Sequence, residues 1–377
     1  MNAVLRAACC VLVLAGCARN GERSQGLAPD PEAIDLDGGN LLNLARGASV
    51  VSRTAELTLE NSAAHAIDGE WRTFWKSPGG GTDQTFVFSL PARSRIDRVG
   101  VITSPNAPDA PQFVSFEASD DGLAWRDVGT VAIEPHRDPR LIAVKPFEAN
   151  YLRTHTDENF DYYTTVRSFV ALGKEIAPVK QPSIAGCWTI NGMPSRFIQR
   201  GSSIAGVIGT DRPMYVSGGT DGRALRLMWL RGPMWGPAMV TLDPRRAALS
   251  GVRWHERVDP LTSGDGWFGT PGSASCDDIA MEEKLIETQI AARILQRAGK
   301  WVAYGDSAFD TLEALLRRSP SQQFRIVASN AARLETVRSA LQARGVDLAR
   351  VELTVVAARR TNEPQRAIAD GVELHAR

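Results

Sequence analysis

The sequence has no excess of charge of either sign, because 43 Lys and Arg balance 43 Asp and Glu among its 377 residues. A nucleic-acid-binding surface or a polybasic membrane patch leaves a positive excess, so neither partner is expected. Beyond the first 14 residues no apolar run approaches the length of a membrane span. The length is sufficient for two or three domains, each with its own core.

Cysteine and histidine are also scarce, at five residues each, and their spacing matches no zinc-ligand pattern. Cys9, Cys10 and Cys17 lie in or directly after an N-terminal apolar run, which leaves Cys187 and Cys276 as a pair in the body of the chain. In an exported protein such a pair most simply forms a disulfide. Closing a loop of about 90 residues stabilises the fold by roughly 4 kcal/mol on the chain-entropy model.

The N-terminus has the anatomy of an export signal. Arg6 precedes a short apolar run that ends in Leu14-Ala15-Gly16-Cys17, and the run is too short to remain as a membrane span. This ending resembles the lipobox of bacterial lipoproteins. The resemblance implies that residues 1–16 are a signal peptide and that Cys17 carries the lipid. An ordinary cleaved signal peptide, in which Cys17 is incidental, is the alternative.

Residues 17–40 contain few large apolar side chains and therefore predict a flexible tether. Ala18 stands where an aspartate usually holds lipoproteins at the inner membrane. The resemblance thus implies an outer membrane lipoprotein, periplasmic or surface-facing, whose membrane partner is reached through the lipid anchor.

Residues 41–176 contain short alternating runs separated by Asp-Gly and Pro turns, which predict an antiparallel β-sandwich. Four motifs there resemble the discoidin, or coagulation factor 5/8 type C, domain: Asn43-Leu44-Ala45-Arg46-Gly47, the run from Ala66 to Trp75, the run from Ala118 to Trp125, and Leu172-Gly173. The resemblance implies an eight-stranded jelly-roll that binds ligands, often galactose-type sugars, through loops at one end.

A loop at 159–163 combines aromatic faces, on which a sugar ring can stack, with amide and carboxylate groups. Binding a glycan and simple loop packing are both open for it. The candidate ligand-binding residues are Asn159, Phe160, Tyr162 and Tyr163, with Asn106, His136, Arg153 and His155 as weaker candidates. Trp75 and Trp125 are expected to pack instead.

No cofactor is expected, except that the resemblance implies a structural calcium ion at Asp68 and Thr73, held by backbone carbonyls. Relatives add a glutamate before the last strand, but the sequence here reads Val166-Arg167-Ser168-Phe169. An arginine at that place opposes a bound cation.

Residues 177–184 include two prolines and predict a stiff linker. Glycine-marked hairpins over 185–277 predict an antiparallel meander that forms a small barrel or a curved sheet, with Cys187 and Cys276 at its two ends. Gly186-Cys187-Trp188 weakly resembles lipocalin-like barrels. A carrier of a small apolar ligand is therefore the alternative function.

After residue 282 helical and strand patterns alternate and predict an α/β sandwich. Gln323-Phe324-Arg325-Ile326, the helical run 333–341 and Val372-Glu373-Leu374 resemble the OmpA-like domain. The resemblance implies peptidoglycan as a partner, bound through Arg333. Ala328-Ser329-Asn330-Ala331 replaces the acidic loop of that family, so 282–377 is a degenerate member whose arginine can hold a carboxyl group but not the neighbouring amine.

An enzymatic role is not expected. Tyr304-Gly305-Asp306-Ser307 follows a predicted strand like a GDSL-type nucleophile, but that chemistry needs a histidine with an aspartate three residues before it. His375 is the only later histidine, and Val372 lies three residues before it. The sequence therefore predicts a multidomain, mostly β, non-catalytic cell-envelope protein.

Overall fold

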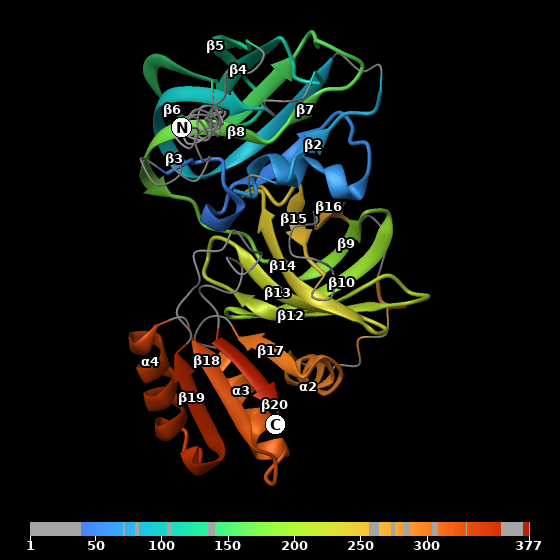
Figure 1. Ribbon diagram of the computed structural model, residues 1–377, viewed down its shortest axis with the longest axis vertical. Coiled ribbons are helices and arrows are strands. Elements are labelled where there is room, and N and C mark those ends of the chain that lie inside the picture. The colour runs from blue at the N-terminus through green and yellow to red at the C-terminus, as the bar shows by residue number, and fades with distance from the viewer. Residues whose placement is uncertain are drawn as a thin grey trace, which may run out of the picture.

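The computed structural model describes residues 39–70, 72–79, 83–103, 108–134, 140–255, 264–272, 276–279, 281, 287–303, 308–328, 330–355 and 372–376. Residues 1–38, which include the predicted signal peptide, Cys17 and most of the predicted tether, lie outside this part of the chain, as do Asn106, His136 and residues 304–307. Three units follow one another along the long axis: an N-terminal sandwich, a central barrel and a C-terminal α/β unit (Figure 1). None of the helices in the described part of the chain has the length and apolar character needed to cross a bilayer.

The N-terminal unit is an antiparallel sheet in the order β1-β3-β6-β4-β5, with β8 also pairing with β3, and a separate pair β2-β7. The strands are β1 (Ser49–Arg53), β2 (Trp75–Lys76), β3 (Gln84–Ile102), β4 (Phe113–Ser119), β5 (Arg126–Ala132), β6 (Arg140–Thr156), β7 (Thr165–Val166) and β8 (Ser168–Pro178). The sequence predicted separate strands at 85–90 and 96–102, but β3 runs through both. Two register shifts, between Ser89 and Ser94 and between Ile96 and Arg98, bend this strand.

Alternating apolar residues of these strands face one core, as the sequence pattern predicted. Trp75 is fully buried, its indole N–H donates to the Ala55 carbonyl at 2.9 Å, and its ring meets Phe86 edge-on at 4.6 Å. Trp75 is therefore a packing residue, as predicted. Trp125 is half-buried on the outer sheet face, where the Arg153 guanidinium lies 4.6 Å from its ring centre.

The central unit is a closed eight-stranded barrel, which confirms the predicted meander. Strand β16 returns to β9 through three paired positions, Gly269 with Ile190, Thr270 with Thr189 and Pro271 with Trp188. The strands are β9 (Gly186–Ile190), β10 (Met193–Arg200), β11 (Ser203–Ile208), β12 (Met214–Thr220), β13 (Leu225–Arg231), β14 (Met234–Leu242), β15 (Leu249–Arg253) and β16 (Asp265–Pro271). Cys187 and Cys276 form the predicted disulfide across this seam.

The barrel interior is filled with side chains. Trp188, Phe197 and Trp229 form one cluster with aliphatic residues from several strands, and all three are at most 3% exposed. An eight-stranded barrel is just wide enough for its own side chains or for one small ligand. The packing here favours the first arrangement and weighs against the carrier hypothesis.

Both flanking units pack on the outer face of the barrel. Met239, Val252 and Trp254 belong to the core cluster of the N-terminal unit, whereas Met228, Leu230 and Trp235 join the C-terminal cluster. The predicted linker is correspondingly short, because β8 continues to Pro178 and Ile184 is buried in the barrel core. The three units therefore share apolar cores at both junctions.

Polar contacts fix the junction between sandwich and barrel. Glu175 accepts hydrogen bonds from Arg46 at 2.7 Å and from Arg223 at 2.9 and 2.8 Å. The bond from Arg223 is the main reason that the pKa of Glu175 lies below its ordinary value. Val50 donates its backbone N–H to Ser250 Oγ at 2.8 Å, close to the same junction.

The C-terminal unit has the predicted alternation of helices and strands. Its sheet has the order β17-β20-β18-β19, in which β18 and β19 are parallel and β20 is antiparallel to β17 and β18. The elements are α2 (Glu287–Ala298), β17 (Lys300–Ala303), α3 (Ala308–Arg318), β18 (Phe324–Ala328), α4 (Ala331–Ala343), η4 (Leu348–Arg350), β19 (Val351–Val355) and β20 (Val372–Ala376). The OmpA-like assignment stays a prediction.

Candidate functional site

The loop between β6 and β7 is held in place by neighbouring loops of the same unit. The backbone N–H of Phe160 donates to the Ala110 carbonyl at 3.1 Å, and the Gln112 side-chain amide donates to the Asn159 carbonyl at 2.9 Å. Inside the loop, the Thr164 hydroxyl donates to Asn159 Oδ1 at 2.7 Å. Asn159 therefore helps to order the loop, whose shape is defined by several bonds rather than by one.

This ordered loop presents aromatic rings to solvent. Phe160 is 42% exposed and Tyr162 is 60% exposed, although both are large apolar side chains. Tyr162 lies against Gly79, where an added Cβ would come within 1.9 Å of the ring. Its ring also meets that of Tyr163 edge-on at 5.0 Å. A glycine at position 79 thus leaves room for a tyrosine face that remains accessible.

Charged groups lie beside the aromatic rings. The Lys76 ammonium is 4.1 Å from the ring centre of Tyr163 and 2.8 Å from Asp109 Oδ2. The loop therefore combines flat apolar faces with a hydrogen-bond donor and an acceptor. Such a surface suits a ligand that has both an apolar face and hydroxyl groups.

Arg153 lies outside this loop, on the outer face of the sheet. Its guanidinium forms a bidentate ion pair with Glu117, the residue opposite it in the β4–β6 register, with Nη2 2.7 Å from Oε1. The hydrogen bond from Arg153 is the main reason that the pKa of Glu117 is lowered. The structure thus gives Arg153 a partner within the sheet, and ligand binding by this residue stays a prediction.

A family comparison agrees with this fold and with the sequence motifs. Residues 49–168 match the F5/8 type C domain. The discoidin resemblance is thereby confirmed for this part of the chain. No curated protein sequence matches the chain.

Solved structures of similar shape cover about the same part of the chain. The C-terminal domain of a chitobiase from Bacteroides fragilis is 23% identical, with a TM-score of 0.32, and the match covers 34% of this chain and 95% of that one. A CBM32 module from a Clostridium perfringens family 31 glycoside hydrolase is 20% identical, with a TM-score of 0.31 and coverage of 34% and 93%. Chitosan-binding module 2 of a Paenibacillus sp. IK-5 chitosanase/glucanase, solved with chitotriose, is 20% identical, with a TM-score of 0.30 and coverage of 35% and 100%.

The predicted calcium ligands of the F5/8 type C domain form a buried hydrogen-bond network. The Thr73 hydroxyl donates to both carboxylate oxygens of Asp68, at 2.9 and 2.8 Å, and the Glu70 backbone N–H donates to Oδ1 at 2.8 Å. His65 Nδ1 lies 2.7 Å from Asp68 Oδ2, and His65 Nε2 lies 2.7 Å from the Gly264 carbonyl in the barrel. These side chains are occupied by one another and do not fit a calcium ligand set. Coordination by the backbone carbonyls of Asp68 and Thr73 stays a prediction.

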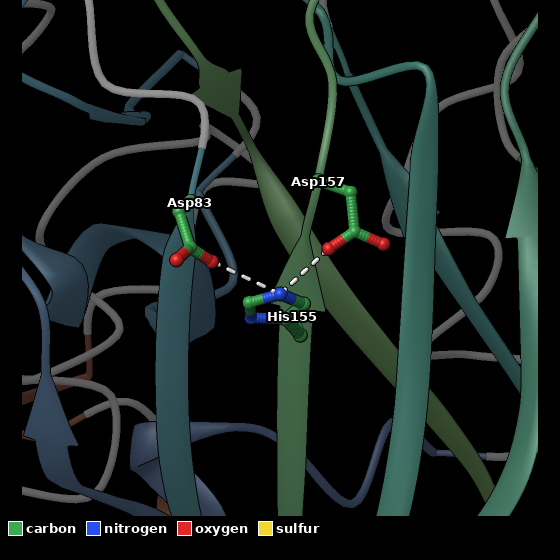
Figure 2. A group of neighbouring side chains, drawn as sticks. All are labelled: Asp83, His155 and Asp157. Atoms are coloured by element: carbon green, nitrogen blue, oxygen red, sulfur yellow. Dashed lines mark ion pairs between the residues drawn. The ribbon is translucent and has the colours of Figure 1, made fainter.

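A second polar group lies at the end of β6 and was not foreseen as a group. Asp83, His155 and Asp157 come together because β3 and β6 pair at Thr85 and His155 (Figure 2). Sequence reasoning named only His155. The sequence does show that Asp157 lies two residues after His155 at a strand end. The approach of Asp83, just before β3, depends on the β3–β6 pairing register, which the sequence does not show.

Arg333 lies in the first turn of α4, where its side chain is half-buried. Asn330 caps this helix by accepting the Arg333 backbone N–H at 2.8 Å. Asn330 belongs to the segment that replaces the acidic loop of the OmpA-like family. The cap explains the conformation at the start of α4, whereas peptidoglycan binding by Arg333 stays a prediction.

Proposed function

We propose that this protein is a non-catalytic, lipid-anchored protein of the cell envelope that binds a carbohydrate through its F5/8 type C domain. The observation that carries the proposal is the ordered loop that exposes Phe160 and Tyr162 next to Tyr163, whose ring lies 4.1 Å from the Lys76 ammonium. Large apolar side chains exposed singly are common, whereas two aromatic side chains exposed on one short loop are typical of a binding site.

The chemistry of the loop suits a sugar. The apolar face of a pyranose ring stacks on an aromatic face, and its hydroxyls pair with ammonium and carboxylate groups. Tyr162 supplies the most exposed ring, and Asp109 and Lys76 supply an acceptor and a donor nearby. The ion pair between Lys76 and Asp109 positions both groups before a ligand arrives, which reduces the entropy lost on binding.

Glycan binding is tested with an array probed by the full-length chain, followed by calorimetry on the best glycan. Tyr162→Ala is expected to weaken binding by about fivefold, since an aromatic contact contributes ~1 kcal/mol. The double change Phe160→Ala and Tyr162→Ala is expected to weaken it by about 30-fold on the same basis.

Leu123→Ala is the matched control, because Leu123 is also apolar and exposed, at 77%, but lies in the hairpin between β4 and β5. This control is expected to bind like the unchanged protein. An absence of any glycan on the array, or equal affinity of the double variant, would contradict the proposal.

Two further parts of the proposal concern position in the cell. The motif Leu14-Ala15-Gly16-Cys17 supports a lipid anchor on Cys17 and hence an outer membrane location. Arg333 on α4 supports an association of the C-terminal unit with a carboxyl group of peptidoglycan. In this arrangement the anchor holds one end of the chain while the C-terminal unit contacts the wall.

Retention on isolated sacculi tests the wall contact. Arg333→Ala is expected to lower retention by about tenfold or more, because a hydrogen bond to a charged group contributes ~1.5–3 kcal/mol. Arg338→Ala is the control on the same helix, since Arg338 pairs with Glu335 at 3.3 Å. Equal retention of the Arg333→Ala and unchanged chains would rule out the wall contact.

A further inference from the structure

Three potential metal ligands converge on one point of the F5/8 type C domain. His155 Nε2 lies 3.0 Å from Asp83 Oδ1 and 2.6 Å from Asp157 Oδ1. In Figure 2 the two carboxylates approach the imidazole from opposite sides, Asp83 from just before β3 and Asp157 from just after β6. One ring nitrogen therefore faces two anionic oxygens.

The other ring nitrogen is held by a residue outside this group. His155 Nδ1 is 2.9 Å from Thr85 Oγ1, and Thr85 is the residue opposite His155 in the β3–β6 ladder. In the neutral imidazole, when Nδ1 donates its proton to this hydroxyl, Nε2 carries a lone pair. A lone pair between two carboxylates repels both of them, whereas a bound cation attracts all three groups. A second bond that orients the imidazole is the usual accompaniment of a metal-binding histidine.

The separations between the imidazole nitrogen and the two carboxylate oxygens also suit a small divalent ion, and all three atoms lie within 4.8 Å of one another. Ligands that lie about 2.1 Å from a metal are roughly 3.0–3.4 Å apart in octahedral or tetrahedral geometry. The separation from Nε2 to Asp83 is already in this range, and that to Asp157 needs a widening of a few tenths of an ångström. Asp157 is exposed enough for this adjustment, at 58% of its side chain.

We propose that Asp83, His155 and Asp157 bind a divalent transition-metal ion, for which Zn²⁺ is the probe. An imidazole nitrogen with two carboxylates favours Zn²⁺ and its neighbours over Ca²⁺ and Mg²⁺, which prefer sets of oxygens alone. Three protein ligands leave at least one position open, and the exposure of Asp83 places that position toward solvent. The proposal does not depend on glycan binding.

The test is calorimetric titration of the full-length chain, without a histidine tag, with zinc chloride and separately with magnesium chloride. Unchanged protein is expected to bind Zn²⁺ at this site and to show much weaker binding of Mg²⁺. Loss of a residue that only orients a metal ligand weakens metal binding by roughly 10–100-fold. Because His155→Gln and Asp83→Asn each remove a ligand itself, each should weaken zinc binding by at least this factor. Thr85→Val should weaken it by about tenfold, since it removes the orienting hydroxyl alone.

His375→Gln is the matched control, because His375 pairs with a single carboxylate, that of Glu373 at 2.8 Å. This variant is expected to bind Zn²⁺ like the unchanged chain.

Circular dichroism checks the fold of each variant. If His155→Gln misfolds, Asp83→Asn still tests the site, because the Asp83 side chain is 80% exposed and its substitution is not expected to disturb the fold. The proposal is overturned by zinc affinity that is equal in Asp83→Asn and unchanged protein, or by no zinc binding at all. Glycan binding measured in the presence of a chelator reports on the carbohydrate site separately.

Discussion

Trp229→Ala is expected to lower the free energy of unfolding by about 3–5 kcal/mol, the usual cost of removing a large buried aromatic side chain. Trp229 is fully buried in the barrel. Its indole N–H donates to the Trp254 carbonyl at 3.0 Å, and its ring meets His255 edge-on at 4.9 Å. The substitution therefore opens a cavity and leaves a buried carbonyl without its donor. Equilibrium unfolding in urea measures the loss.

Trp229→Phe separates these two contributions. Phenylalanine keeps most of the ring volume but cannot donate to the Trp254 carbonyl, so the expected loss is only about 1–3 kcal/mol. Trp254 itself packs in the core of the N-terminal unit, and the same bond thus links the barrel interior to the junction. If the alanine variant were no less stable than the phenylalanine variant, the filled interior described for the barrel would be wrong.

Removing the disulfide through Cys187→Ala and Cys276→Ala is expected to destabilise the chain by roughly 2–5 kcal/mol. The two cysteines are 89 positions apart, so the bond closes a long loop in the unfolded chain. It also lies at the weakest seam of the barrel, where β16 and β9 share three paired positions while β12 and β13 share six. Without the bond, the barrel stays closed through this short ladder and the hydrogen bonds beside it, such as that from Asn191 N–H to the Phe268 carbonyl at 2.9 Å.

Thermal unfolding with and without a reductant measures this effect. The unchanged protein is expected to lose stability in the reductant, whereas the double variant should be insensitive to it. The short seam is also expected to open first, and hydrogen exchange at Thr189 and Thr270 detects that opening. An unchanged unfolding temperature of the double variant would show that the ladder alone secures the barrel.

The regular parts of the fold were accessible from sequence because their apolar residues alternate with a strand period. Phe86 and Phe88 identified their strand in this way, and the glycine-marked hairpins identified the barrel strands. The length of β3 was not accessible, because its bulges let one strand continue past a stretch that looked like a turn. Closure of the barrel also depends on a pairing between residues about 80 positions apart, which local patterns do not encode.

The candidate site was accessible to a different degree for each residue. Phe160 and Tyr162 were named because aromatic residues in a polar loop stand out, and both prove to be exposed. Arg153 was also named, but its pairing with Glu117 depends on the β4–β6 register. For the same reason the approach of Asp83 to His155 could not be foreseen, since the two residues are distant in sequence and meet only through the β3–β6 ladder.

The shared cores at the two barrel junctions have a mechanical consequence. A pull on the loop around Tyr162 passes through packed side chains of the sandwich and the barrel before it reaches the C-terminal core, because barrel residues belong to the apolar clusters of both neighbouring units. The described part of the chain is therefore expected to resist bending between its three units, which follow one another along the long axis (Figure 1). A ligand bound by the N-terminal unit is thus expected to stay at a fixed distance from the C-terminal unit.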